Sequence, residues 1–228
     1  MRNSMVRPIL FLFCCLCIII ASCSKSSAPL NTANVMFVNG CLNTSSLSVK
    51  ANSVAVDGAS GIGFLTTSGY VHVKAGSGVN LTFFMANTGT PLANRAENIS
   101  TTNHYTAFAG GDVSDPKYVF TTDDLTPPAS GNAKLRFINL SPDNINETAT
   151  LNDSVVAQDI LSNSVSSFTQ LRAGKYTIGA FDPANSSLLI DATDSILFQG
   201  GKIYTVLLTG TAGSTGANGL IFSVIKNN

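Results

Sequence analysis

Residues that could do chemistry are few in this chain of 228 residues, and they match no familiar catalytic pattern. There are two histidines, His72 and His104, and five cysteines, of which only Cys41 lies beyond the first 30 residues. Neither Gly-x-Ser-x-Gly nor His-Glu-x-x-His occurs, and Cys-x-x-Cys occurs only in an amino-terminal apolar run. We therefore expect a protein that is not an enzyme and that uses no cofactor or metal. Hydrolysis by paired carboxylates is the less favoured alternative.

The amino terminus has the pattern of a secretory signal peptide. Residues 1–7 carry Arg2 and Arg7 and no acid, and 12 apolar residues follow at positions 9–20. As a helix this run would extend about 18 Å, short of the roughly 30 Å hydrocarbon core of a bilayer. We expect it to be cleaved rather than to remain as a membrane span.

The residues Ile20-Ala21-Ser22-Cys23 resemble the lipobox of bacterial lipoproteins. The resemblance implies that residues 1–22 are removed and that Cys23 receives lipid, with acyl chains such as palmitate on its thiol-linked glyceride and its amine. Two or more chains hold a protein stably on a bilayer, at about 0.8 kcal/mol per buried methylene. Ser24 differs from the aspartate that retains many lipoproteins in the inner membrane, so we expect the outer membrane. An ordinary secretory leader is the alternative.

Once the leader is removed and Cys23 carries lipid, Cys41 is the remaining thiol. One thiol cannot form an internal disulfide, and a catalytic thiolate would need a nearby base. We expect Cys41 to be a buried structural residue.

The charge of the chain gives no reason to expect a nucleic-acid partner. Basic and acidic residues number 13 each, and removal of Arg2 and Arg7 leaves 11 basic groups against 13 acidic ones. The partners we expect are the membrane, through the lipid anchor, and an envelope protein or a glycan.

The chain contains an internal repeat of about 95 residues. Aromatic, Asn, Gly and basic residues recur in the same order in both halves, at a shift of 98–100 positions. The matched segments are VMFVNG (35–40) with LRFINL (135–140), SGYVHVKAG (68–76) with SSFTQLRAG (166–174), and HYTAFAG (104–110) with IYTVLLTG (203–210). The repeat predicts a tether at 23–33, a first domain at 34–124, a Pro-rich linker at 125–131 and a second domain at 132–228.

Each half reads as antiparallel β-structure. Short runs rich in β-branched and aromatic residues are separated by Gly, Asn, Asp and Pro at intervals of roughly 8–12 residues, which favours a sandwich or barrel. No segment shows a sustained helical period, and Pro127-Pro128 would interrupt a helix or a central strand.

The second half is similar to the family of domains of unknown function 4397. The segments that carry the likeness are TTDDLTPPASGNAKLRFINLSPD (121–143), LRAGKYTIGAFD (171–182) and GGKIYTVLLTG (200–210). The first half is degenerate, because Cys41-Leu42-Asn43 stands where the second half has Ser-Pro-Asp. The resemblance extends over nearly the whole mature chain and implies two tandem immunoglobulin-like antiparallel β-sandwiches. It implies no catalytic residue.

Paired acids on loops raise the possibility of calcium. Asp112 and Asp115 form one pair, and Asp123 and Asp124 form another. A calcium site uses six to eight oxygen ligands, and no such loop is present. We expect these side chains to accept hydrogen bonds from turn backbones.

A glycan-binding role would suit an exported protein but would need exposed aromatic faces. The chain has no Trp, and the repeat marks Tyr70, Tyr105 and Tyr204 as core residues. The aromatics that could remain exposed are Tyr118, Tyr176 and Phe83 or Phe84. An accessory glycan-binding lipoprotein therefore stays an alternative without a recognisable platform.

Two serines resemble O-glycosylation acceptors. Asp153-Ser154-Val155 and Asp194-Ser195-Ile196 are similar to the Asp-Ser/Thr-aliphatic pattern used by Bacteroidota. Taken together, the sequence predicts a non-enzymatic lipoprotein of the outer membrane that acts as an interaction or structural module.

Overall fold

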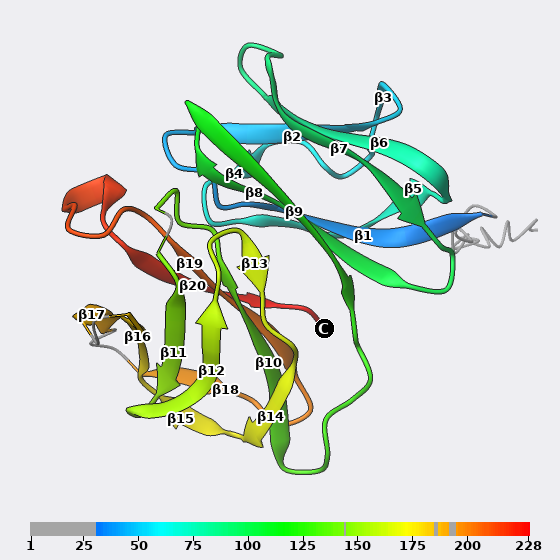
Figure 1. Ribbon diagram of the computed structural model, residues 1–228. Coiled ribbons are helices and arrows are strands. Elements are labelled where there is room, and N and C mark those ends of the chain that lie inside the picture. The colour runs from blue at the N-terminus through cyan, green and yellow to red at the C-terminus, as the bar shows by residue number, and fades with distance from the viewer. Residues whose placement is uncertain (1–30, 144, 185–186, 192–194) are drawn as a thin grey trace, which may run out of the picture.

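The computed structural model describes residues 31–143, 145–184, 187–191 and 195–228. The predicted signal peptide, Cys23 and most of the predicted tether lie outside these residues. Within them the chain forms two β-sandwiches, here called unit one (residues 32–123) and unit two (residues 132–228), one above the other (Figure 1). The helical content of the described part is one 3₁₀ turn, η1 (Gly216–Asn218). No helix there is long and apolar enough to cross a membrane.

Unit one is a sandwich of two sheets, with strand orders β5-β1-β8-β9 and β3-β2-β6-β7, and β4 also pairs with β2. Its strands are β1 (Thr32–Asn39), β2 (Ser46–Ala51), β3 (Val54–Ala55), β4 (Ile62–Gly63), β5 (Thr67–Lys74), β6 (Gly76–Met85), β7 (Pro91–Ile99), β8 (His104–Asp112) and β9 (Asp115–Asp123). Strand β1 begins at Thr32, inside the segment that the sequence predicts to be a tether.

Unit two repeats this plan with shorter strands. One sheet has the order β13-β10-β19-β20 with β14 also on β10, another has the order β12-β11-β16-β17, and β15 pairs with β18. The strands are β10 (Asn132–Asn139), β11 (Glu147–Leu151), β12 (Ser154–Ile160), β13 (Ser164–Val165), β14 (Thr169–Arg172), β15 (Gly174–Tyr176), β16 (Ile178–Asp182), β17 (Ser187–Asp191), β18 (Ile196–Phe198), β19 (Ile203–Thr209) and β20 (Ile221–Lys226).

The strand registers match the repeat found in the sequence. Val35 pairs with Tyr105 in unit one, and Leu135 pairs with Tyr204 in unit two. The expected all-β fold of two tandem immunoglobulin-like sandwiches is therefore confirmed. One detail differs from the prediction: β1–β8 and β10–β19 run parallel. A parallel neighbour requires a long crossover, and here the chain builds the second sheet of each unit before it returns.

Polar residues shared by the two halves hold the loops of each sandwich. Tyr105 Oη accepts a hydrogen bond from Ser100 N at 3.0 Å, and Tyr204 Oη accepts one from Gln199 N at 3.0 Å. Both tyrosine rings are buried, which confirms their predicted core position. These side chains have the same structural role in each copy.

The two units pack against each other through sheets that are buried on both faces. Along β1, Val35 and Phe37 enter the core of unit one, whereas Met36 and Val38 point the other way into a separate interdomain cluster. The remaining buried members of that cluster are Phe108, Val119, Ile138, Leu140, Leu207 and Ile225. Burial on both faces explains why β8 and β19 are almost continuously buried.

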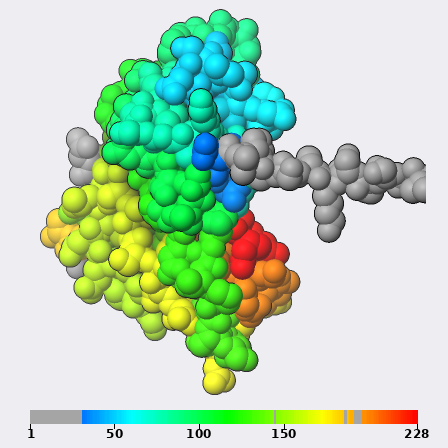
Figure 2. Space-filling model, turned by 90° about the vertical axis from the view of Figure 1, so that its right-hand side faces the viewer, coloured from blue at the N-terminus to red at the C-terminus, as the bar shows by residue number. Residues whose placement is uncertain are grey.

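The space-filling view shows how closely the units meet (Figure 2). The carboxyl-terminal segment, drawn red, lies directly beneath the start of unit one, drawn blue. Asn227 Nδ2 near that terminus donates a hydrogen bond to Tyr70 Oη of unit one at 3.4 Å. The two sandwiches therefore pack against each other and are not separated by an extended linker.

Candidate functional site: a groove between the units

A groove of about 490 Å³ lies between the two units. Its volume falls within the roughly 300–1,000 Å³ typical of ligand pockets, which often occur at domain boundaries. Unit one contributes Leu42, Asn43, Thr44, Phe64 and Leu65, and unit two contributes residues 216–221. Neither unit alone could form this site.

The lining of the groove is neutral. Its apolar part includes Phe64, Leu65 and Ile221, and amides come from Asn43 and Asn218. No residue of the lining carries a formal charge. The surface is therefore suited to a neutral ligand that combines an apolar face with hydrogen-bonding groups.

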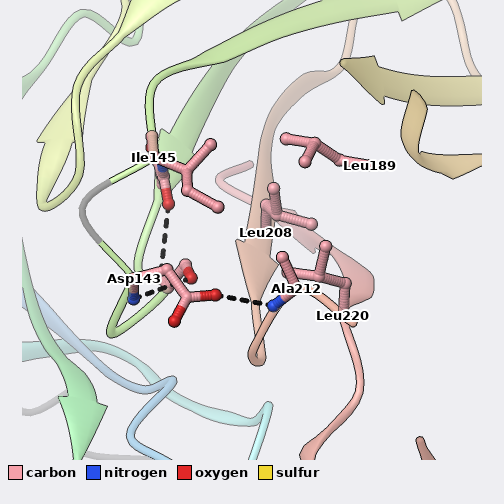
Figure 3. A pocket seen from close by; sticks show the side chains of 8 residues that line it. Asp143, Ile145, Leu189, Leu208, Ala212 and Leu220 are labelled. Carbon is pink, nitrogen blue, oxygen red and sulfur yellow. Dashed lines mark hydrogen bonds between the residues drawn. The ribbon is translucent and has the colours of Figure 1, made fainter. Parts of the chain in front are cut away.

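The Ser-Pro-Asp turn of unit two holds the start of the loop whose residues 216–221 line the groove. Asp143 Oδ2 accepts a hydrogen bond from Ala212 N at 2.6 Å (Figure 3). Ser141 Oγ donates one to the carbonyl oxygen of Gly210 at 2.7 Å. A small pocket of about 10 Å³ beside the turn has room for roughly one water molecule. The motif that carries the family resemblance thus acts as a structural clamp on residues 210–212.

The wall contributed by unit one is equally well held. Asn39 Oδ1 accepts hydrogen bonds from Cys41 N at 3.2 Å and from Thr44 Oγ1 at 3.1 Å. Asn43 Nδ2 donates to Asp112 Oδ2 at 2.5 Å. The position of the turn at 41–44 is therefore largely set before any ligand arrives.

A hydrogen bond joins the two units close to the groove. Thr209 Oγ1 of unit two donates to the carbonyl oxygen of Gly40 in unit one at 2.9 Å. Cys41, the next residue, is completely buried, as predicted. Burial, with a smaller contribution from the charge of Asp112, raises the pKa of its thiol to about 12. Such a thiol is a poor nucleophile at neutral pH.

Further grooves lie at open edges of the sandwiches within the described residues. Two lie in unit one, at about 430 and 300 Å³, and share Asp57 and His72. One of about 390 Å³ lies in unit two and is lined by residues 156–158 and 166–169. They occupy corresponding places in the repeat, but the residues that line them differ. We therefore attribute their position to the shared fold and not to a shared ligand.

The two histidines lie on either side of Asn34, on β5 and β8. His72 and His104 both pair with Asn34 in strand register. His72 is exposed, whereas the His104 ring lies edge-on to Tyr70 and its Nε2 is 3.1 Å from Asn34 Nδ2. Across the described residues, no three His, Cys, Asp or Glu side chains gather as metal ligands.

The turn role predicted for the loop acids holds for two of them. Asp112 accepts hydrogen bonds from Ser114, which lower its pKa. Asp124 accepts from Lys134 and Thr126, which lower its pKa to about 2.

The prediction was wrong for the other two acids. Asp115 forms an ion pair with Lys117 at 2.7 Å. Asp123 is the last residue of β9 and pairs with buried Arg136, because docking of unit two covers that end of the strand.

The aromatics expected to remain exposed are largely covered. Phe83 is completely buried, and the hydroxyl of Tyr118 is buried without a hydrogen-bond partner among the described residues. Burial raises the pKa of Tyr118 above its usual value. Phe84 lies under the Lys50 ammonium at 4.5 Å, and Tyr176 Oη donates to the carbonyl oxygen of Arg172 at 2.8 Å. The aromatic ring in the interdomain groove is Phe64, which sequence reasoning missed.

The two candidate glycosylation serines are exposed. Ser154 follows a hairpin turn in which Asn152 and Asp153 have φ values of 46° and 62°. Asn52 and Ser53 form the matching turn in unit one, with φ values of 47° and 70°. Ser195 directly follows residues outside the described ranges. Modification of Ser154 and Ser195 stays a prediction.

Glu147 was also missed by sequence reasoning. It is 1% exposed, and neither carboxylate oxygen has a hydrogen-bond partner in the described structure. Burial raises its pKa to about 8. Leu47 is its counterpart in unit one, and a longer alignment of the two halves would have revealed the exchange.

Comparison with known proteins places these features in a family context. The model of the family Domain of unknown function (DUF4397) matches residues 33–149. The match covers unit one and the start of unit two, including the Ser-Pro-Asp turn, so it is shorter than the nearly full-length resemblance expected. Unit one, expected to be the degenerate copy, is matched in full.

Among solved structures, the C-terminal domain of AlgF from P. aeruginosa is similar, with 18% sequence identity and a TM-score of 0.31. The alignment covers 42% of this chain and 98% of that one. None of the curated proteins matches the chain.

Proposed function

Because the chain belongs to the DUF4397 family, which carries no assigned activity, we propose that it is a non-enzymatic, lipid-anchored protein of the outer membrane that binds a neutral ligand between its two units. The observation that carries this proposal is the role of the Ser-Pro-Asp turn. Its side chains are engaged with Gly210 and Ala212, at the start of the loop that continues to the groove-lining residues 216–221. A preorganised wall reduces the entropy lost when a ligand binds.

The envelope location is supported by the amino-terminal pattern. Cys23 follows a short apolar run and small residues, and β1 starts nine positions later at Thr32. As a flexible coil, a segment of that length has a root-mean-square reach of about 17 Å, enough to hold unit one clear of the lipid headgroups.

Metabolic labelling with a clickable fatty acid tests the anchor. The wild-type chain should incorporate label and fractionate with outer membranes, and Cys23→Ala should lose both properties. Cys41→Ala is the matched control and should retain both. A wild-type chain that takes up no label would refute the anchor.

The neutral lining of the groove favours a glycan as the ligand. Phe64 offers a half-buried ring, and Asn43 and Asn218 offer amides. Sugars commonly stack on rings and exchange hydrogen bonds with amides. This supports the alternative of an accessory glycan-binding lipoprotein in polysaccharide capture.

An array of neutral and acidic glycans, probed with the chain from residue 24 onward, tests this ligand class. Binding to neutral glycans should fall at least tenfold in Phe64→Ala and remain in Thr169→Ala, which alters the groove of unit two. If acidic glycans bind best, or if Phe64→Ala has no effect, the interdomain groove is not the site.

A further inference from the structure

The faces by which the units dock are built from corresponding positions of the repeat. Val38 and Phe108 of unit one face a cluster that contains Ile138 and Leu207 of unit two, and these residues are equivalent in strand register. At these positions each unit presents an apolar side chain to the other, as the two subunits of an isologous dimer do. Apolar matching alone would also allow such a patch to pair with a copy of itself.

Some equivalent positions differ in size, as Gly40 and Leu140 do, and at two positions they differ in charge. Arg136 in β10 stands where unit one has Met36, and Asp123 in β9 stands where unit two has Asn227. The two exceptions face each other across the boundary. Arg136 Nη2 lies 2.6 Å from Asp123 Oδ1, and the side chains are 2% and 0% exposed.

Residues of unit one donate further hydrogen bonds to the Asp123 carboxylate. Tyr70 Oη donates to Asp123 Oδ2 at 2.5 Å, and Thr106 Oγ1 donates to the same oxygen at 2.6 Å. Burial and the nearby Asp123 charge raise the pKa of Tyr70, so its phenol remains a donor at neutral pH. Thr121 Oγ1 accepts from Arg136 Nη1 at 3.3 Å.

Residues of unit two contact the Arg136 guanidinium. Arg136 Nε donates to Thr205 Oγ1 at 3.1 Å, and the guanidinium carbon lies 4.6 Å from the centroid of the Phe168 ring. Thr205 Oγ1 donates onward to Asn227 Oδ1 at 2.9 Å. Asn227 Nδ2 in turn donates to Tyr70 Oη, so the hydrogen-bond network closes across both units.

We propose that this pair of residues makes the docking face selective: unit one recognises unit two and rejects a second unit one, and unit two rejects a second unit two. The partner that fits each face is therefore the other half of the repeat.

The physical reason is that every homotypic pairing would bury an unpaired charge. Two copies of unit one would place each Asp123 opposite Met36, and two copies of unit two would place each Arg136 opposite Asn227. An uncompensated buried charge is strongly destabilising, whereas the heterotypic pair buries both charges together. Selectivity arises because only the wrong pairings carry that cost.

Re-pairing of separated units tests the proposal. A protease site is inserted at 127–130 in the chain from residue 24 onward, the folded protein is cut, and the halves are separated in denaturant and remixed at equal concentration. Native mass spectrometry then counts the pairs. Heterotypic pairs should exceed each homotypic pair by at least about tenfold, because only they neutralise the buried charges.

The two single substitutions should have opposite effects. Arg136→Met should permit pairs of two units two but not pairs of two units one. Asp123→Asn should permit pairs of two units one but not pairs of two units two. The double variant, whose faces are alike at these positions, should give a mixture of all three pairs. Removing the more exposed ion pair between Lys134 and Asp124, at 2.6 Å, by Lys134→Met is the control and should leave selectivity unchanged.

The proposal would be overturned if the unsubstituted halves formed homotypic pairs as often as random pairing predicts. It would also be overturned if all three variants formed heterotypic pairs exclusively. If the double variant fails to fold before cleavage, the two single variants still decide the question, because each predicts a different homotypic product.

Discussion

Leu140 of unit two packs against Gly40 of unit one so closely that a β-carbon on Gly40 would lie 2.6 Å from Leu140 Cδ1. The Leu140 side chain also lies against Gly110, where a β-carbon would come within 2.9 Å. Next to these contacts, Gly111 N donates a hydrogen bond to the carbonyl oxygen of Leu140 at 2.9 Å. Small residues in unit one therefore let the backbones of the two units meet directly.

Gly40→Ala should destabilise the protein by about 1–3 kcal/mol, because the added methyl must displace Leu140 in a filled interface. Thermal unfolding followed by circular dichroism measures the loss. Gly63→Ala is the control, since a β-carbon there meets nothing nearer than Thr66 Oγ1 at 3.5 Å. Equal melting temperatures for the two variants would show that the interface tolerates the methyl group.

Glu147→Leu should raise stability at pH 7 by about 1–3 kcal/mol, because a buried carboxyl without partners is replaced by the residue that unit one uses at Leu47. Urea unfolding gives the free energy directly. A loss of stability would mean that Glu147 is satisfied in solution by a group such as water.

The same carboxyl predicts a dependence of stability on pH. Its pKa is about 8 in the folded protein, above the usual value of about 4.3 for the unfolded chain, so the folded state binds the extra proton. Stability from this group is complete below about pH 4.3 and is lost as pH rises through about 8. Glu147→Gln should flatten the fall measured between pH 5 and 9. Asp57→Asn, at an exposed acid, controls for loss of charge, and an unchanged slope in Glu147→Gln would contradict the assignment.

Asp143→Ala should loosen the groove wall, because Ala212 N loses its acceptor. Hydrogen–deuterium exchange should increase at residues 211–220 and remain unchanged in unit one. Asp182→Ala removes a similar turn bond, to Ala184 N at 2.9 Å, in a part of unit two away from the groove and serves as the control. Unaltered exchange at 211–220 would show that the clamp is not what orders the loop.

Cys41 should resist maleimide in the folded protein, because it is completely buried and its pKa is about 12. For the chain from residue 24 onward, in which Cys41 is the remaining thiol, intact-mass analysis should show one adduct only after unfolding in guanidinium. Ser154→Cys places a thiol at an exposed position and should react at once. Rapid native labelling of Cys41 itself would mean that the groove wall opens readily.

The sequence by itself determined the repeat and the β-sandwich architecture. Phe37 and Phe137, or Tyr105 and Tyr204, recur at nearly constant spacing because each copy buries the same inward side chains. The local sequence pattern is enough to predict these strands, because the alternation of apolar and polar residues and the turn residues act within one strand or hairpin.

Only the tertiary structure decided how the two copies meet. The outward faces of β1 and β10 mix apolar residues such as Val38 and Ile138 with a cation, Arg136, and nothing local identifies what covers them. Arg136 and Asp123 read as ordinary surface charges until docking removes both from water and makes each the charged partner of the other. The groove, the interdomain cluster and this ion pair all depend on contacts between the two units, which strand periodicity does not encode.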